Sequence, residues 1–462
     1  MKKNEDSSLP RRSFLGGAAA AATAAFSIIP RRVLGGTGYT APSDKLNIAG
    51  IGVGGMGKSN LSRCEEENIV ALCDVDWGFA AKTFEKYPNA KRYKDFRQML
   101  DQQNDIQAVI IATPDHTHAV IGMEAIRRKK HVYIQKPLAH SVYEARLLTE
   151  EARKQRVMTQ MGNQGRSGEG VRLLCEWIWA GAIGPVREVH AWTNRPVWPQ
   201  SVEVERPQET PAVPAEMDWD KWIGPAAFRP YHPAYHPGQW RGWWDFGTGS
   251  LGDLGCHIMD PIFWAIKLKY PVSVEGCIST YWKELWKYVE PKNEMYPRST
   301  IVRFQFPARE DMPEVKLTWW DGGMVPPRPE ELEPGRRMGD EDGGVLFIGD
   351  KGTILCGCYG RSPRLIPEAK MKEFTIPAKT LDRVATGESG HEKDWIRSCK
   401  DGKPASSHFE NSGPLSETVL MGNLAVRYPN RKLMWNGEKM EVTNDADANA
   451  YVRRQYRQGW SL

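Results

Sequence analysis

The sequence predicts an α/β fold: an N-terminal parallel sheet, followed by a C-terminal α+β domain with a large, mostly antiparallel sheet. Two observations support this. Apolar strand-like runs alternate with helical segments between residues 45 and 161, which is typical of a parallel sheet with crossover helices. After residue 184, strand-like runs follow one another with few helices between them, which favours antiparallel pairing. A chain of 462 residues suits about two to three domains.

Charge and cysteine content exclude several classes of protein. The net charge is +5, but residues 1–36 alone contribute six basic against two acidic side chains, so the remainder is close to neutral. No basic stripe is left for a nucleic acid. The eight cysteines contain one close pair, Cys356 and Cys358, without a second pair at metal-ligand spacing. We therefore expect no nucleic-acid partner, no disulfide framework and no metal site.

The N-terminus predicts an export signal. Arg11-Arg12 precedes an Ala-rich apolar stretch that ends at Ile29, too short for a stable membrane span. This pattern is typical of the twin-arginine route and predicts a periplasmic or otherwise exported protein, with residues 1–42 as signal and linker. The alternative is an Ala-rich first helix of the fold, which Pro30 and the following glycines disfavour.

The first domain, residues 43–165, carries a dinucleotide-binding pattern. An apolar run, 45–51, leads into Gly52-Val53-Gly54-Gly55-Met56-Gly57, which is G-x-G-x-x-G. In such a turn the first glycine permits the tight bend, the second permits close approach of a pyrophosphate, and the third permits helix–strand packing. The pattern predicts a Rossmann domain whose cofactor lies against Gly52, Gly54, Gly55, Met56 and Gly57.

Asp74 ends the next predicted strand, Asn68 to Cys73, 22 residues after Gly52. An acid at this distance is placed to bind the adenosine ribose hydroxyls and to repel a 2′-phosphate. No Arg or Lys follows within the next three residues. NAD is therefore favoured over NADP, while the alternative for Asp74 is a turn residue at a strand end.

Further strands end in polar loops. The strand 106–112 ends at Thr113-Pro114 and leads to His118, and the strand 131–134 ends at Gln135-Lys136-Pro137. Ligands of open parallel sheets bind beyond the carboxyl ends of the strands. The candidate cofactor-binding residues on these loops are Thr113, Pro114, His118, Gln135 and Lys136.

These motifs, together with Gly252-Asp253-Leu254-Gly255-Cys256-His257, resemble the Gfo/Idh/MocA family (glucose-fructose oxidoreductase/inositol dehydrogenase) over roughly residues 44–440. The resemblance implies an NAD-dependent oxidoreductase acting on CH–OH groups, with Asp253 and His257 facing the nicotinamide beside Lys136. It also implies a homodimer or tetramer. Family members usually carry Glu where this chain has Gln135, so a negative charge beside the lysine is missing.

The residue types suit this chemistry. Asp253 and His257 are four residues apart and share one helix face. His257 can take a hydroxyl proton near neutral pH, Lys136 can stabilise a developing alkoxide, and Asp253 can orient the imidazole or bind a neighbouring hydroxyl. The alternative for His257 is a satisfied buried histidine at a helix start.

The second domain, residues 166–440, precedes a tail, 441–462. Its segment 192–244 is rich in tryptophan, which can stack on the faces of a pyranose. We expect a carbohydrate-facing loop, with Trp240, Arg241 and Tyr231 as candidate substrate contacts. The alternatives are a Trp-rich core and, for Arg241, a structural ion pair.

Three functions remain open. The leading one is an exported NAD-dependent oxidoreductase of a sugar or sugar derivative, with a tightly bound cofactor. The second is a redox-assisted glycoside-cleaving enzyme that works by oxidation and elimination, with His257 or Tyr231 as base. The third is a nucleotide-binding protein without turnover, for which Gln135 is the only hint.

Overall fold

The computed structural model describes residue 41, residues 44–292 and residues 294–462. The predicted twin-arginine signal lies outside the described residues. Residues 47–462 form one compact unit, which contains the whole of the fold described below.

The first layer is a six-stranded parallel sheet with the order β3-β2-β1-β4-β5-β6, which confirms the predicted N-terminal sheet. The strand order reverses between β1 and β4, and ligands of such sheets bind in the crevice at this point. The strands are β1 (Asn47–Ile51), β2 (Asn68–Cys73), β3 (Lys91–Tyr93), β4 (Ala108–Ile111), β5 (His131–Ile134) and β6 (Thr159–Met161). The helices are α3 (Met56–Ser62), α4 (Trp77–Lys86), α5 (Phe96–Gln102), α6 (Asp115–Arg127) and α7 (Val142–Gln155).

Local chemistry explains where these elements begin and end. β4 is Ala-Val-Ile-Ile and is buried throughout, as expected for a central strand covered on both faces. α7 begins at a capping box: Ser141 Oγ accepts from the amide of Glu144, and Glu144 Oε2 accepts from the amide of Ser141. The helix ends at Arg156 in the left-handed conformation.

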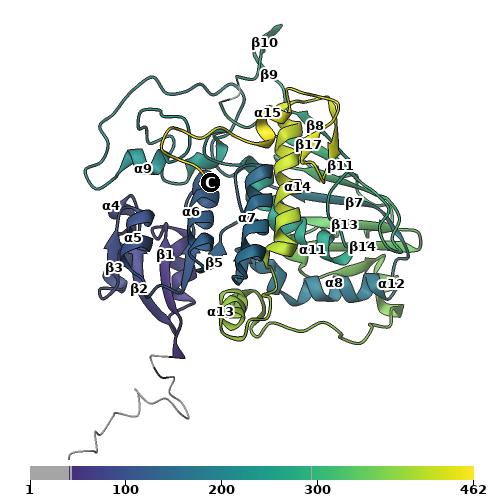
Figure 1. The fold of residues 1–462 in the computed structure, drawn as a ribbon. Helices are drawn as coiled ribbons and strands as arrows, with labels where there is room; N and C mark the ends of the chain where they lie inside the picture. The colour runs from purple at the N-terminus through teal and green to yellow at the C-terminus, as the bar shows by residue number, and fades with distance from the viewer. Residues whose placement is uncertain (1–40, 42–43, 293) are drawn as a thin grey trace, which may run out of the picture. The chain divides into compact units, whose positions relative to one another are not determined.

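The second layer is a nine-stranded sheet with the order β15-β14-β13-β7-β12-β11-β8-β16-β17. Only β7 and β12 pair in parallel; the other neighbours are antiparallel, which confirms the predicted mostly antiparallel sheet. The strands are β7 (Val186–Thr193), β8 (Ser273–Ile278), β11 (Thr300–Phe306), β12 (Val315–Trp320), β13 (Gly343–Gly349), β14 (Gly352–Gly357), β15 (Arg364–Ile366), β16 (Lys432–Asn436) and β17 (Glu441–Val442). A separate hairpin, β9 (Tyr281–Glu284) and β10 (Lys287–Val289), projects from the body (Figure 1).

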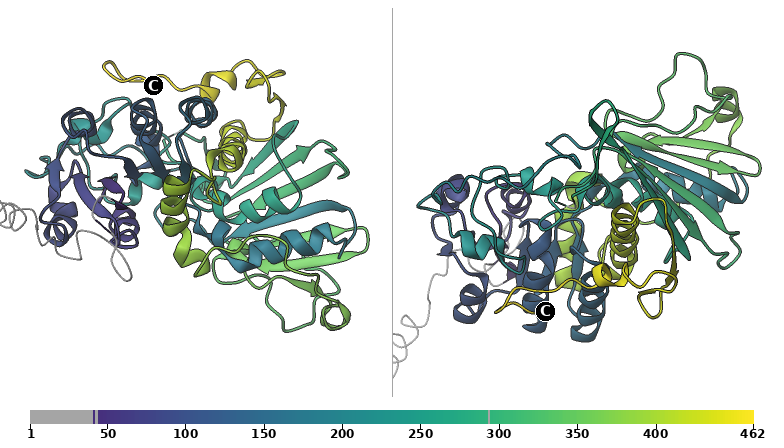
Figure 2. Two further views of the ribbon diagram at one scale, coloured as in Figure 1. Left: turned by 60° about the horizontal axis from the view of Figure 1, so that its bottom comes forward. Right: turned by 90° about the horizontal axis from the view of Figure 1, so that it is seen from above.

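Helices join the two sheets. α14 (Phe409–Arg427) runs beside α7 and packs against β8 (Figure 1). α13 (His391–Asp401) and α14 lie between the parallel sheet and the large sheet (Figure 2). The remaining helices are α8 (Glu169–Trp179), α9 (Trp219–Ile223), α10 (Gly249–Ile258), α11 (Asp260–Ala265), α12 (Glu368–Glu373) and α15 (Asn449–Val452). Among the described helices, none combines the length and the apolarity needed to cross a bilayer.

Candidate active site

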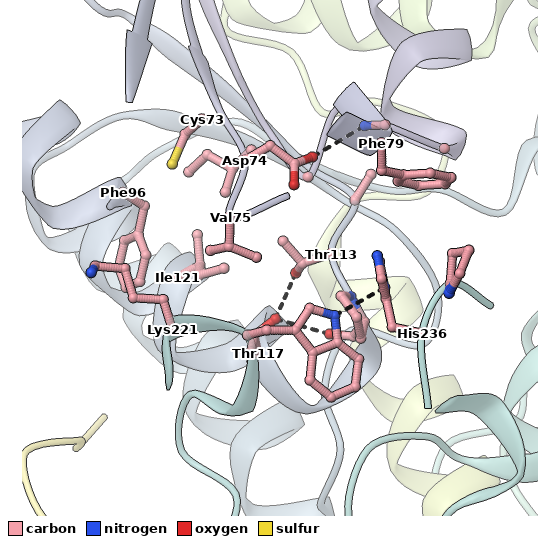
Figure 3. A pocket seen from close by; sticks show the side chains of 18 of the residues that line it. Cys73, Asp74, Val75, Phe79, Phe96, Thr113, Thr117, Ile121, Lys221 and His236 are labelled. Atoms are coloured by element: carbon pink, nitrogen blue, oxygen red, sulfur yellow. Dashed lines mark hydrogen bonds between the residues drawn. The ribbon is translucent and has the colours of Figure 1, made fainter. Parts of the chain in front are cut away.

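A cavity opens at the carboxyl ends of β1, β2 and β4. Gly52, Asp74 and Thr113 line it from the parallel sheet, and His236 and Trp240 line it from the later aromatic segment. Figure 3 shows Val75, Phe96 and Ile121 gathered at one end of the cavity, with Phe79 and His236 at the other. The cavity lies at the point where the strand order reverses, so it occupies the place where this fold binds ligands.

The glycine-rich turn fits a dinucleotide. Gly52 has φ +77°, and a Cβ there would lie 2.7 Å from the amide nitrogen of Thr113. A Cβ on Gly57 would collide with the carbonyl oxygen of Gly52, so the third glycine allows α3 to pack against the turn. Gly54 lies under the ring of Phe79, which leaves no room for a side chain at that position. Gly52 and Gly57 therefore require glycine because a Cβ there meets backbone atoms, whereas a Cβ on Gly54 would displace the Phe79 ring. Gly54, Gly55 and Met56 line the cavity directly.

Asp74 holds this turn in place. Its Oδ2 accepts hydrogen bonds from the amides of Val53 (2.7 Å) and Gly54 (3.1 Å), and its Oδ1 accepts from the amide of Asp76 (3.0 Å). Burial raises the pKa of Asp74 to about 6, although the three amides act in the opposite direction. Asp74 therefore lines the cavity and links the end of β2 to the glycine turn.

Besides Arg241, three cationic side chains line the same cavity, and none of them lies next to Asp74 in the sequence: Lys94, Arg97 and Lys221. Each has a partner within the protein. Arg97 forms a bidentate pair with Asp95 (3.0 and 3.1 Å), Lys221 pairs with Asp218 (2.5 Å), and Lys94 donates to the carbonyl of Glu216 (3.0 Å). The sequence argument considered only the residues next to Asp74 and missed these cations.

The loop after β4 contributes in two ways. Thr113 and Pro114 line the cavity, and Thr117 Oγ1 donates to Thr113 Oγ1 at 2.8 Å. His118 is 1% exposed and does not touch the cavity. Its Nδ1 lies 2.8 Å from the carbonyl of Pro137 and its Nε2 lies 2.8 Å from the carbonyl of Thr113. In this geometry His118 fixes the loop after β4 against the loop that carries Lys136.

The predicted catalytic residues lie together. Lys136 Nζ donates to Asp253 Oδ1 at 2.7 Å and to the main-chain oxygen of Asp253 at 2.6 Å. Two arginines approach the same carboxylate: Arg241 Nε lies 3.4 Å from Oδ1 and Arg195 Nε lies 3.6 Å from Oδ2. Burial alone would raise the pKa of Asp253, but Lys136 and Arg241 hold it at about 2. Asp253 is thus ionised at neutral pH, and its carboxylate lies close to the side chains of Lys136, Arg195 and Arg241.

His257 lies one turn after Asp253 on α10 and is 5% exposed. Its ring packs edge-on against Tyr359, with centroids 4.7 Å apart. Burial, followed by the charge of Lys136, holds the pKa of His257 well below its ordinary value, so the imidazole is neutral at neutral pH. Its Nδ1 is buried and has no hydrogen-bond partner within the described part of the chain. The site therefore combines a neutral base, His257, with a cation, Lys136, which Asp253 holds in place.

Gln135 takes part in a buried network with α3 and α13. Its Nε2 donates to Asn60 Oδ1 at 3.0 Å, and Asn60 Nδ2 donates to Glu392 Oε1 at 2.7 Å. Glu392 is 1% exposed and also accepts from Arg63 at 3.3 Å. Asn60 Oδ1 needs a donor, which an amide supplies and a carboxylate does not. The Gln at this position therefore matches its surroundings.

Four of the seven tryptophans in the predicted carbohydrate-facing segment belong to one buried aromatic cluster: Trp219, Trp222, Trp240 and Trp243. Trp219 stacks on Trp222 at 4.6 Å, and Tyr231 packs edge-on against Trp219 at 5.2 Å. Among the candidate substrate contacts, Trp240 and Arg241 line the cavity, and the guanidinium of Arg241 lies 4.4 Å from the centre of the Trp240 ring. Tyr231 belongs to the aromatic cluster and not to the cavity lining.

Several residues of the site carry no sequence signal that we recognised. Arg195 follows β7 and also pairs with Asp342 (3.1 Å). His236 accepts from Trp222 Nε1 at 3.1 Å, and its Nε2 lies 3.0 Å from Asp76 Oδ2, so it ties the aromatic segment to the amino end of α4. Trp460 reaches the cavity from the tail. Motif spacing marks none of them, because each is brought in by tertiary packing.

Within the described residues, no group of three His, Cys, Asp or Glu side chains is placed to hold a metal ion.

Two domain families match the chain. Residues 46–163 match a family described as an oxidoreductase family with an NAD-binding Rossmann fold, and residues 187–280 match the C-terminal alpha/beta domain of the same oxidoreductase family. The two matched ranges coincide with the parallel sheet and with the first part of the large-sheet domain.

Relatives and solved structures point the same way. Inositol 2-dehydrogenase of Salmonella typhimurium (strain LT2) is 30% identical over 146 residues, which are 30% of this chain and 43% of the relative. Levoglucosan dehydrogenase of Pseudarthrobacter phenanthrenivorans is 27% identical over 228 residues, 46% of this chain and 50% of the relative. The chain thus spans about half the length of the curated relatives that it matches. The WlbA dehydrogenase of Bordetella pertussis, solved with NADH and UDP-GlcNAcA, has a TM-score of 0.55 at 15% identity, covering 85% of this chain and 99% of that one, and so shares the fold.

Proposed function

We propose that this chain, which belongs to the Gfo/Idh/MocA family of oxidoreductases, transfers a hydride between a ring carbinol of a sugar or cyclic polyol and NAD. The observation that carries the proposal is the contact of Lys136 with Asp253 beside the neutral base His257. Arg241 connects this cluster to the dinucleotide cavity, because it lines the cavity and approaches Asp253. The relatives named above act on a cyclic polyol and an anhydrosugar, which supports the substrate class.

The residues divide the work of oxidation between them. NAD, when bound, supplies the acceptor for the hydride that leaves the carbinol carbon. The hydroxyl proton passes to an imidazole nitrogen of His257, which is neutral and therefore has a lone pair available for it. The ammonium of Lys136 stabilises the negative charge that develops on the oxygen. Asp253 positions Lys136, and its ionised state keeps the cluster from carrying an unopposed excess of positive charge.

NAD rather than NADP is the proposed nucleotide. The carboxylate of Asp74 lines the cavity at the end of β2, where it repels a 2′-phosphate. The cations that line the cavity nearby are engaged with protein oxygens, so accepting a 2′-phosphate would require them to exchange partners.

We further propose that the enzyme is exported by the twin-arginine route and keeps its nucleotide bound between turnovers. The support is Arg11-Arg12 with its apolar stretch, together with the scarcity of free NAD expected outside the cytoplasm. A second sugar or keto-sugar then returns the hydride within the same site. A homo-oligomer remains our expectation from the family.

One experiment tests the core of the proposal. The protein is purified with its leader replaced and denatured, and the released nucleotide is identified by mass spectrometry. We expect about one NAD or NADH per chain. Recovery of NADP contradicts the role given to Asp74. Absence of nucleotide, with no binding of added NAD, contradicts the enzyme proposal and favours a protein without turnover.

Product analysis then separates oxidation from cleavage. With a glycoside as substrate, the proposed oxidoreductase yields a keto-sugar without release of the aglycone. Oxidation followed by elimination instead releases the aglycone with no net NADH. Release of the aglycone would therefore show that the same residues catalyse glycoside cleavage and not simple oxidation.

A further inference from the structure

The last ten residues of the chain form a strap across the nucleotide-binding half of the molecule. We use the name strap for residues 453–462, which follow α15. Figure 1 shows this yellow segment running from α15 toward α9 and turning back to its end above α6, and Figure 2 shows it on the outside of the helices. The strap lies outside the residues matched by either domain family.

Buried groups anchor the first part of the strap. Arg454 Nε pairs with Glu144 Oε1 at 2.7 Å, and Tyr456 Oη donates to the same oxygen at 2.8 Å. Glu144 is fully buried and is already fixed by the capping box of α7. The guanidinium of Arg454 also donates to the main-chain oxygen of His116, at the start of α6. Charged pairs to a buried carboxylate hold this part of the strap in one position.

Arg457 anchors the second part on the loop after α9. Its amide donates to the carbonyl of Pro225 (3.0 Å), its Nε donates to the carbonyl of Gly224 (3.1 Å), and its Nη1 pairs with Asp220 Oδ1 (2.5 Å). The amide of Trp460 then donates back to the carbonyl of Arg457 at 3.1 Å. This turn directs the chain toward the cavity.

The side chain of Trp460 lines the cavity. Its indole ring lies 6.2 Å from the ring of Phe96, and the guanidinium of Arg97 stacks over it at 4.5 Å. Arg97 is itself held by Asp95, the N-cap of α5. The indole therefore has a fixed place in the lining, between α5 and the loop after α9.

The part of the cavity that Trp460 closes is the part that suits an adenine ring. Asp74 and Val75, at the carboxyl end of β2, mark the adenosine half of a dinucleotide site. Val75, Phe96 and Ile121 form an apolar slot at this end (Figure 3). A flat purine gains from burial between apolar and aromatic side chains.

We infer that Trp460 is an adenine-binding residue and that the strap retains the nucleotide in the cavity. The inference rests on the proposed function, because it takes NAD as the occupant, and it adds a binding residue from a segment that no motif marks. The bound adenine lies against the indole, and the anchors of Arg454 and Arg457 keep that indole in place. Release of the nucleotide then requires the strap to leave the cavity.

The test measures the exchange of bound nucleotide. The purified protein, with its leader replaced, is mixed with isotopically labelled NAD, and the bound label is followed by mass spectrometry. Trp460→Ala is expected to raise the exchange rate and the Kd for NAD about ten-fold or more, and the Kd for ADP-ribose by the same factor, because ADP-ribose shares the adenosine half. Trp460→Phe is expected to restore most of the loss. A chain that ends at Arg453 is expected to exchange fastest.

The matched control is Trp286→Ala, which removes an equally large ring that is 83% exposed on the β9–β10 hairpin. It should exchange at the wild-type rate. The melting temperatures of the nucleotide-free variants show whether each variant is folded. A folded variant with faster exchange has lost only the indole that lines the cavity. Wild-type exchange and wild-type Kd values in a folded Trp460→Ala variant overturn the inference. A wild-type chain that binds neither NAD nor ADP-ribose instead overturns the proposed function itself.

Discussion

Lys136 Nζ lies 2.7 Å from Asp253 Oδ1 and 2.6 Å from the main-chain oxygen of the same residue. The contact joins the loop after β5 to α10, two segments 117 residues apart. A single residue thus receives both hydrogen bonds of the ammonium, which fixes the position of the cation relative to His257 on the same helix. The catalytic geometry therefore depends on how α10 docks against the parallel sheet.

Lys136→Met is expected to lower turnover by about 10²- to 10³-fold while leaving bound nucleotide near one per chain. Removal of the cation takes away the group that stabilises the developing alkoxide, which is an effect on the transition state. Turnover and nucleotide content are measured on the same preparation. Lys154→Met serves as the control, because that side chain is 73% exposed on α7. Unchanged turnover in Lys136→Met contradicts the assigned role.

Asp74 makes nucleotide binding depend on pH. Burial raises its pKa to about 6, and the ionised carboxylate is the form that accepts hydrogen bonds from ribose hydroxyls. If only this form binds, the Kd for NAD is constant above about pH 7 and weakens about ten-fold by pH 5. Calorimetric titration across this range checks the slope. In Asp74→Asn the Kd for NAD should no longer change with pH. A pH dependence that survives in this variant shows that another group causes it.

The same pKa has the opposite effect on the nucleotide-free fold. An acid whose pKa is raised by folding favours the folded state while it is protonated, that is, below its unfolded value near 4. This contribution is lost as the pH rises through about 6. Because NAD binds the ionised form, the rise in melting temperature that NAD causes should grow between pH 5 and pH 7. A rise that is constant over this range contradicts the assignment of Asp74 as the coupled group.

Gly52→Ala is expected to destabilise the protein and to weaken nucleotide binding together. Gly52 has φ +77°, and an added Cβ would lie 2.7 Å from a backbone nitrogen that cannot move without displacing the loop after β4. The conformational cost alone is about 1–2 kcal/mol. Gly181→Ala is a matched control: this glycine has φ +80° but open space around its Cβ. Equal losses of melting temperature in the two variants show that strain alone, without the collision, accounts for the effect.

Much of the fold could be predicted from the sequence. β2 and β5 have the predicted limits, because short apolar runs between turn residues leave few alternatives. The glycine turn and Asp74 could be identified because a dinucleotide fixes their spacing along the chain. Lys136, Asp253 and His257 came from the resemblance to the family, and the structure brings Lys136 and Asp253 together on one face of the site. The catalytic roles of these three residues stay a prediction. The two domain matches confirm the predicted family.

The rest depends on contacts between distant segments. Arg195 approaches Asp253 because β7 ends beside α10, and Trp460 reaches the cavity because Arg454 and Arg457 anchor the strap. A lone Arg or Trp carries no periodicity that marks it. The role of Gln135 likewise depends on partners that the sequence does not reveal. The sequence presents it as a lost charge, whereas the structure pairs it with Asn60 and, through Asn60, with Glu392.

Gln135→Glu is therefore expected to damage the protein rather than to improve it. The new carboxylate cannot donate to Asn60 Oδ1, and it competes with the buried Glu392 for the one amide of Asn60. The free energy of unfolding should fall by about 1–3 kcal/mol, the cost of a buried group left without its partner. Denaturant unfolding measures it, and Gln102→Glu, at an exposed position at the end of α5, is the control.

A double-mutant cycle with Glu392→Gln tests the coupling directly. In the double variant the acid and the amide change places, and Asn60 can rotate to donate to Glu at 135 and accept from Gln at 392. The two substitutions together should then cost less than the sum of the single ones, with a coupling of about 0.5–3 kcal/mol. Additive costs would show that Gln135 and Glu392 do not communicate through Asn60. In that case the damage from Gln135→Glu comes from the buried charge alone, and the Gln at this position is set by desolvation rather than by its partners.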